Sequence, residues 1–253
     1  MMSINMIAGN TGTADSTRCA ACTTRDTCLG GATSSGACGF GDSSVRELSR
    51  GQHLFRVGEG VNCVYMLRSG AVKTYLMTAS GDEQILGFFS PGDIIGFDSL
   101  AVGKHGRNAV ALVGSEVCRI PLESLLQDCG RDRGLLTRLL SGMGQEIQRL
   151  QAMLKMERLT AEQRIALFLI NQARRQSRGE GVSLSRSVQL TMTRGEIGRF
   201  LDLATETVSR TLTKLKDAGL IAIERNSVEF RDLAALQRMA QGQNDFVPAR
   251  IAA

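Results

Sequence analysis

Cysteines are the residues of this sequence whose spacing most directly suggests chemistry. Seven occur along the chain, and Cys19, Cys22 and Cys28 form a C-x2-C-x5-C pattern. Two residues between thiolates let both sulfurs face one metal centre, a step that zinc sites and iron–sulfur clusters share. Because such a centre takes four ligands, the pattern predicts a metal site that needs a further donor. Spacing alone leaves four candidates for that donor, Cys38, Cys63, Cys118 and Cys129.

The cellular compartment decides between metal and disulfide chemistry for these thiols. The N-terminal residues have neither a basic start nor an apolar core, so they do not resemble a secretory signal. No apolar run approaches the roughly 20 residues that span a bilayer. We therefore expect a cytoplasmic protein without membrane attachment, whose cysteines stay reduced.

The predicted ligands lie in a segment that cannot order itself. From Gly30 to Ser44, Gly and Ser supply nine of 15 residues, a composition typical of flexible chain. Residues 1–50 are therefore expected to form a flexible cysteine-bearing segment that gains order from metal binding.

A turn-rich β domain is predicted over residues 51–130. Every second residue from Val61 to Leu67 falls on one face, and the alternation resumes after a turn at Gly70. Six to eight short strands at this spacing predict a sandwich or barrel. On such a strand Cys63 is most simply a small core residue, which is the alternative to its role as a ligand.

A long amphipathic helix is predicted over residues 131–158. Its apolar residues are spaced alternately by four and three, the 3.5-residue period of a coiled-coil seam. No charged residue interrupts this apolar seam, which consists of Leu136, Leu140, Met143, Ile147, Leu150 and Leu154. A stripe this narrow favours a partner helix, so we expect a homodimer. The alternative is a helix that packs only on its own β domain.

The C-terminal part, residues 159–235, has the charge and layout of a DNA-binding domain. Residues 158–216 include 11 basic and five acidic residues, an excess of +6 in a chain of net charge +5, which suggests a polyanion partner. Thr193 and Glu196 form a capping box at the start of a short helix, and a second helix begins near Thr205. This is the layout of a helix-turn-helix, whose second helix enters the major groove of DNA.

The N-terminal end of that second helix is expected to contact DNA. Arginine can hold guanine in a bidentate contact, glutamate can accept from cytosine, and serine can bond a base or a phosphate. A lysine further along the helix would contact phosphate. The predicted DNA-binding residues are Thr205, Glu206, Ser209, Arg210 and Lys214. The alternative, a surface helix with solvated charges, is disfavoured by the local charge excess and by the capped two-helix layout.

The chain resembles the FNR subfamily of the CRP/FNR transcription regulators. The resemblance rests on GDEQILGFFSPGDIIGFDSLA in the β domain, on MTRGEIGRFL and on ETVSR, the FNR form of the recognition helix. It covers nearly everything from Cys19 to about Phe230. It implies an α+β fold with a cyclic-nucleotide-binding-like β-roll, a long dimerisation helix and a winged helix-turn-helix. IAIERNSVEF fits the wing, and residues 236–253 are left as a flexible tail.

The resemblance also implies a mechanism. FNR-like proteins bind an oxygen-labile [4Fe-4S] cluster through three N-terminal cysteines and one sensor-domain cysteine. These map onto Cys19, Cys22, Cys28 and, in EVCRIP, Cys118. The cluster is expected to favour a dimer that binds double-stranded DNA at a TTGAT-N4-ATCAA-like inverted repeat without oxygen, and oxygen is expected to destroy it. Contact with RNA polymerase is implied through the loop from Gly81 to Gly87.

Several positions depart from the patterns of these families. The Gly/Ser segment stands where FNR-like proteins have a Leu-rich amphipathic helix, and Asp202 stands where the helix-turn-helix usually has Gly. Asp tolerates the left-handed backbone of that turn at modest cost. The Gly-Glu and Arg-Ser or Arg-Thr pairs that bind cyclic nucleotides in CRP are absent, since Phe97 follows Gly96 and Asn108 follows Arg107.

Other functions remain open at this point. A regulator of the same architecture could respond to a cyclic nucleotide or to thiol redox chemistry, structural zinc could take the same thiolates, and Cys38 could replace an N-terminal ligand. An iron–sulfur enzyme or electron carrier is disfavoured, because His53 and His105 are the only histidines and neither lies in a triad-like setting. A carrier also needs no helix-turn-helix. We therefore expect no enzymatic activity.

Overall fold

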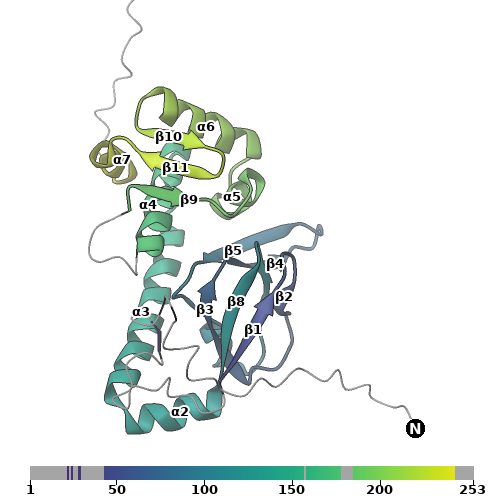
Figure 1. Cartoon of the computed structure of the whole chain (residues 1–253). Coiled ribbons are helices and arrows are strands. Elements are labelled where there is room, and N and C mark those ends of the chain that lie inside the picture. The colour runs from purple at the N-terminus through teal and green to yellow at the C-terminus, as the bar shows by residue number, and fades with distance from the viewer. Residues whose placement is uncertain are drawn as a thin grey trace, which may run out of the picture.

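The computed structural model describes residues 22, 24, 28, 29, 43–156, 158–177 and 185–242. In this part of the chain, a two-sheet β domain lies beside one long helix, and a smaller domain lies at the C-terminal end of that helix (Figure 1). The α+β class and the order of β-roll, long helix and winged helix-turn-helix are confirmed.

The β-roll consists of two four-stranded sheets, ordered β1-β8-β3-β6 and β2-β7-β4-β5, with all pairs antiparallel. Apolar side chains from both sheets, including Leu54, Leu67 and Val72, form the core between them. The elements are β1 (Ser44–Leu48), β2 (His53–Phe55), β3 (Cys63–Ser69), β4 (Val72–Met77), β5 (Glu83–Phe89), β6 (Ile94–Ile95), the short 3-10 helix η1 (Phe97–Ser99), β7 (Asn108–Ala111) and β8 (Ser115–Pro121).

The β-roll begins before the predicted boundary at residue 51. Strand β1 lies inside the segment expected to be flexible, and it pairs with β8 so that Val45 lies opposite Cys118. The pairing satisfies backbone groups that would otherwise leave β8 as a bare edge. The expectation of a flexible chain up to residue 50 is therefore wrong for residues 44–48.

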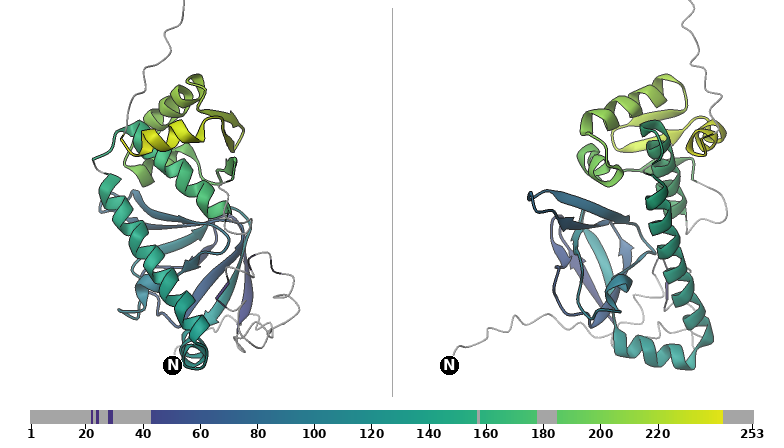
Figure 2. Two further views of the ribbon diagram at one scale, coloured as in Figure 1. Left: turned by 90° about the vertical axis from the view of Figure 1, so that its left-hand side faces the viewer. Right: turned by 180° about the vertical axis from the view of Figure 1, so that it is seen from behind.

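Two helices follow the β-roll. Helix α2 (Leu122–Arg131) occupies the end of the segment assigned to the β domain, and α3 (Arg133–Met156) is the predicted long helix. Asp132 separates them in an extended conformation, and its Oδ1 accepts hydrogen bonds from the backbone N–H groups of Gly134 at 2.7 Å and Leu135 at 3.2 Å. A side chain that accepts in this way starts a new helix. Helix α3 then runs along one side of the β-roll (Figure 2).

The C-terminal domain contains the predicted helix-turn-helix and wing. Thr193 and Glu196 form the expected capping box, and Asp202 has the left-handed φ of 55° that the turn requires. The hairpin of β10 and β11 is the predicted wing. The elements are α4 (Ala161–Gln176), β9 (Ser187–Gln189), α5 (Arg194–Leu201), α6 (Thr205–Asp217), β10 (Ile221–Glu224), β11 (Ser227–Phe230) and α7 (Leu233–Ala240).

Helix α7 corrects the expectation of a flexible tail from residue 236. Leu236 is fully buried and Met239 is 6% exposed, because both pack into the core of the C-terminal domain. Residues 243–253 of the expected tail lie outside the described residues. None of the helices in the described part of the chain is long and apolar enough to cross a membrane.

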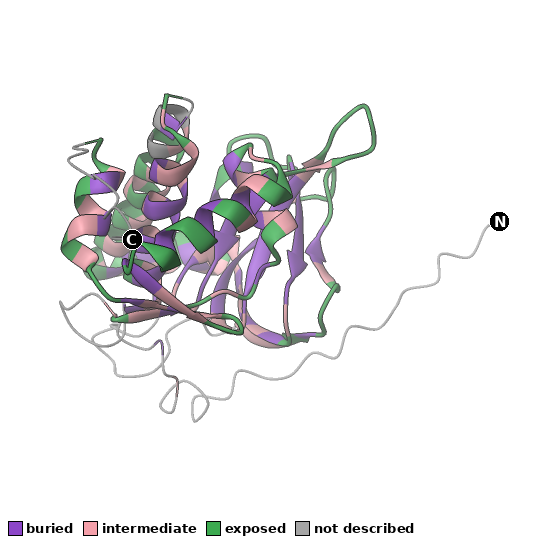
Figure 3. Cartoon of the chain, turned by 90° about the horizontal axis from the view of Figure 1, so that it is seen from above, coloured by how far each residue is buried: buried purple, intermediate pink, exposed green. Residues whose placement is uncertain are grey.

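Buried charges and aromatic rings join the C-terminal domain to the β-roll. Lys73 Nζ on β4 lies 2.6 Å from Glu83 Oε2 on β5 and 3.0 Å from Glu196 Oε1 on α5. Phe88 on β5 packs against Phe168 and Phe200, with ring centroids 6.1 and 5.2 Å away. Viewed from above, buried residues gather where the sheets and helices face one another (Figure 3). The helix-turn-helix is thus held against β4 and β5.

Candidate metal site, dimer seam and DNA interface

The structure brings predicted metal ligands to one face of the β-roll. Cys28 is 8% exposed and lies in an apolar cluster that includes Met66 of β3. Cys118 on β8 packs against the same cluster and lies opposite Met66 in the strand register. Cys22 is also described, whereas Cys19 lies outside the described residues. Among the described side chains, no three of His, Cys, Asp or Glu are grouped closely enough to hold a metal ion.

Cys22 lies in surroundings that favour a thiolate. Its Sγ is 3.2 Å from Thr24 Oγ1, and Arg68 at the end of β3 interacts with it and with Cys118. Burial raises the pKa of the Cys22 thiol, but the hydrogen bonds from Thr24 and Arg68 and the positive charge of Arg68 outweigh it, so the pKa is lowered. Thiolate is the metal-binding form of cysteine. Arg68, which the sequence analysis missed, carries no motif that marks it.

The other candidate cysteines are less suited as ligands. Cys63 is 1% exposed in the separate core between the two sheets. Cys129 on α2 shares the cluster of Cys28, but burial and the negative charges of Asp128 and Asp132 raise the pKa of its thiol. Cys38 lies outside the described residues. Among the described candidates, these surroundings favour Cys118.

Helix α3 has two different faces. One face packs on the protein's own β-roll, where Leu135 is 2% exposed and Arg149 Nη1 donates to the Leu86 carbonyl of β5 at 3.2 Å. The other face exposes most of the apolar seam, with Leu136 at 40%, Leu140 at 58%, Met143 at 39%, Ile147 at 56% and Leu150 at 43%. Leu154 lies on the same helix, but its side chain is not among those described. A row of large exposed apolar side chains is typical of an interaction surface.

The start of α6 is open to solvent. Val208, Leu212 and Leu215 are buried on its inner face. The predicted DNA-binding residues lie on the outer side, where Thr205, Glu206, Arg210 and Lys214 are exposed and Ser209 is half-buried.

Two contacts position this helix. A Cβ at Gly198 of α5 would lie 2.5 Å from the Leu203 carbonyl oxygen, so only glycine lets the turn pack this closely. Lys214 Nζ lies 2.8 Å from Glu162 Oε1 on α4. Because the Lys214 side chain remains 63% exposed, this pair is weak and leaves the lysine available to a phosphate.

In the region that corresponds to the cyclic-nucleotide site of CRP, side chains contact one another. Arg107 Nε lies 2.9 Å from Asp98 Oδ2, and the arginine side chain is 9% exposed. The ring of His105 stacks on Phe55 with centroids 3.6 Å apart. The arginine that would attract a phosphate is therefore already paired with a carboxylate.

Comparisons with known proteins identify the two domains. Residues 45–132 match the family described as a cyclic nucleotide-binding domain, and residues 163–239 match the Crp-like helix-turn-helix domain. The fumarate and nitrate reduction regulatory protein of Escherichia coli (strain K12) is 38% identical over 196 residues, which cover 77% of this chain and 78% of that protein. The fumarate nitrate reduction regulatory protein of Klebsiella oxytoca is 39% identical over 202 residues, 79% of this chain and 80% of that protein.

A solved structure shows the same arrangement. FixK2 from Bradyrhizobium japonicum superposes with a TM-score of 0.69 at 26% identity, covering 78% of this chain and 96% of that one. Fold and interface together define a DNA-binding transcription regulator with a sensor domain of the cyclic-nucleotide-binding type, and not an enzyme. The chain belongs to the FNR subfamily of the CRP/FNR family.

Proposed function

We propose that this regulator senses oxygen through a [4Fe-4S] cluster bound by Cys19, Cys22, Cys28 and Cys118, and that it acts under anaerobic conditions. The observation that carries the proposal is that Cys28 and Cys118 belong to one apolar cluster and that Arg68 interacts with both Cys22 and Cys118. Relatives named as fumarate and nitrate reduction or anaerobic regulatory proteins, at 38% identity, support it.

The residues present fit such a group. Iron–sulfur clusters take four cysteine thiolates and carry net negative charge, and the positive charge of Arg68 lies beside Cys22 and Cys118. When bound, the cluster supplies reactivity toward oxygen. The protein contributes the buried position of Cys28, which limits access of water, and the lowered pKa of Cys22, which favours its thiolate.

The second part of the proposal is a homodimer that places two α6 helices on one DNA site. Pairing of the exposed apolar seam with a second copy would bury side chains that are otherwise in water. In a twofold dimer the recognition helices read half-sites one helical turn apart, which fits an inverted repeat resembling TTGAT-N4-ATCAA. Of the expected loop from Gly81 to Gly87, residues 83–87 instead form the first part of strand β5, so the proposed contact with RNA polymerase is the exposed loop between β4 and β5, residues 78–82.

The cyclic-nucleotide alternative is less well supported. The Arg107–Asp98 pair and the Phe55–His105 stack occupy the region where the ligand would bind, and a phosphate would have to displace the Asp98 carboxylate from the buried arginine. Structural zinc and thiol redox chemistry use the same cysteines as the cluster, so metal analysis has to separate them.

Metal content and a visible spectrum of anaerobically purified protein test the proposal. We expect about four iron and four sulfide per chain, the content of a single [4Fe-4S] cluster, with visible absorption that bleaches in air and DNA binding that weakens with it. Zinc without sulfide, or no metal with an unchanged spectrum, would overturn the proposal and leave a regulator that responds to another signal.

Arg210→Ala tests the recognition helix. Loss of a bidentate contact to guanine is expected to weaken binding to the proposed site by about 1–3 kcal/mol per recognition helix, and binding to random DNA should weaken much less. Lys214→Ala should weaken both equally and reduce the salt dependence of the affinity. Fluorescence anisotropy at several salt concentrations measures both effects. Equal losses on specific and random DNA for Arg210→Ala would show that it contacts only phosphates.

A further inference from the structure

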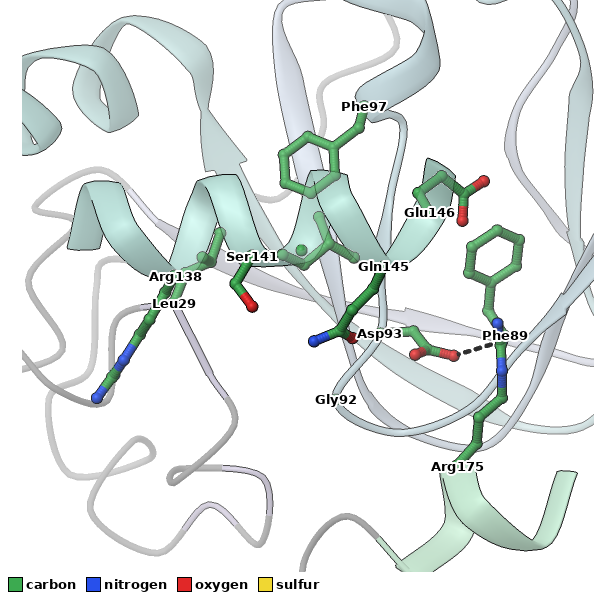
Figure 4. Close-up of a pocket in the computed structure, with 12 residues that line it drawn as sticks. Leu29, Phe89, Gly92, Asp93, Phe97, Arg138, Ser141, Gln145, Glu146 and Arg175 are labelled. Carbon is green, nitrogen blue, oxygen red and sulfur yellow. Dashed lines mark hydrogen bonds and ion pairs between the residues drawn. The ribbon is translucent and has the colours of Figure 1, made fainter. Parts of the chain in front are cut away.

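The segment that carries the third cysteine also supports the dimerisation helix. Arg138 Nη1 of α3 donates a hydrogen bond to the backbone carbonyl of Cys28 at 3.3 Å. The next residue, Leu29, is 2% exposed and packs in one cluster with Leu125 of α2 and Leu135 of α3. Leu29 and Arg138 lie together at one end of a pocket beside α3 (Figure 4). A backbone and a side-chain contact thus hold α3 to the cysteine segment.

These contacts lie directly behind the apolar seam. Leu135 faces the cluster around Cys28, whereas its neighbour Leu136 is 40% exposed on the seam. One turn later, Leu139 packs against the same cluster and Leu140 is 58% exposed. A shift or rotation of α3 on its inner side therefore moves the seam by a similar amount, because both faces belong to one rigid helix.

The remaining contacts of α3 with the β-roll are spaced along the helix. A cavity of about 250 Å³ lies between α3 and the β-roll and is lined in part by Leu29, Arg138, Ser141 and Gln145. Beyond it, Arg149 binds the Leu86 carbonyl. In the N-terminal half of α3, Leu135 and Leu139 pack in one cluster with Leu29 and with Met66 of β3. The cysteine segment is therefore one of the contacts that position this half of the helix.

We propose that Arg138 is a positioning residue that couples the ligand segment to dimerisation. The inference rests on the proposed function, because it requires a group bound at Cys28. Binding through the Cys28 thiolate holds the backbone of residues 28 and 29 in place. The hydrogen bond from Arg138 to this backbone then fixes the position of α3. Two events that favour the same arrangement of one element are thermodynamically linked.

The test compares the full-length Arg138→Met, Arg138→Lys and wild-type proteins. Methionine keeps most of the length of the arginine side chain but cannot donate to the Cys28 carbonyl, whereas lysine can. Arg133→Met on the same helix is the matched control, because Arg133 is exposed. For each protein, iron and sulfide content are measured anaerobically. Sedimentation then gives the monomer–dimer dissociation constant of the loaded protein and of the same protein after chelators remove the iron.

We expect all four proteins to contain equal iron and sulfide. Loading should tighten the wild-type and Arg133→Met dimers by about 5- to 150-fold, the usual range for coupled sites, and the Arg138→Met dimer by less than about 2-fold, with Arg138→Lys between them. If loading tightens the Arg138→Met dimer as much as it tightens the wild-type dimer, the inference is overturned, but the proposed function is not. Loss of iron in Arg138→Met also overturns it, since the residue would then hold the ligand segment rather than couple it. A wild-type protein without iron and sulfide overturns the proposed function as well.

Discussion

Cys118→Ala is expected to lose its cluster and keep its fold. Iron and sulfide in anaerobically purified protein should fall from about four of each per chain to nearly none, because the loss of one of the four thiolates leaves one iron without its protein ligand and weakens binding of the cluster. Cys118 is only partly buried on β8, so removal of its sulfur should cost about 1 kcal/mol or less in free energy of unfolding. Iron and sulfide assays, with thermal unfolding of the iron-free protein, measure both effects.

Cys63→Ala is the matched control, since Cys63 lies on the neighbouring strand β3 but in the core between the sheets. Its side chain is 1% exposed, so the variant should lose about 1–2 kcal/mol of stability through the cavity it creates and keep its iron. Cys118→Ala is therefore expected to lose its iron and keep its stability, whereas Cys63→Ala is expected to keep its iron and lose stability. Wild-type iron in Cys118→Ala would show that another donor, such as Cys129 or Cys38, completes the site.

Ile147→Glu is expected to abolish the dimer without unfolding the monomer. Ile147 is 56% exposed in the single chain, so a glutamate there stays in water until a second copy approaches. Burial of an unpaired carboxylate in the seam should then cost about 3–5 kcal/mol, more than roughly 100-fold in the dissociation constant. Sedimentation velocity of the loaded protein measures the loss, and binding to an inverted repeat should fall with it.

Gln148→Glu adds the same charge one residue along the helix, on an exposed position that does not belong to the apolar seam. This variant should dimerise as the wild type does. The comparison then shows that a negative charge disrupts the dimer only when it lies in the apolar seam. A stable dimer of Ile147→Glu would place the subunit interface on another surface.

Features that depend on neighbouring residues were predictable from the sequence. The capping box of Thr193 and Glu196 involves residues three apart, and the wing hairpin, which the resemblance to the family implied, forms between two strands adjacent in sequence. The apolar seam follows from the period of α3 alone. These elements form as predicted because their signals lie within one or two turns of chain.

Other boundaries required the folded chain. Strand β1 has no strong sequence pattern and is a strand because β8 offers it an unpaired edge. Residues 236–240 of helix α7 were expected as part of a tail, since a helix of only eight residues is too short to be distinguished from flexible chain before Leu236 packs into the core. In both cases long-range contacts outweigh a weak local preference.

The sequence by itself determined the types of group that this protein uses: a C-x2-C-x5-C pattern, an uninterrupted apolar seam and a recognition helix of the FNR form. Only the tertiary structure decided how they meet. It placed Cys28 and Cys118, 90 residues apart in the numbering, at one apolar cluster, set Arg138 behind the seam, and joined Lys73 to Glu196 across two domains. Spacing along a chain constrains neighbours within a turn or two, whereas contacts between distant residues follow from the burial of apolar surface in a single packed core.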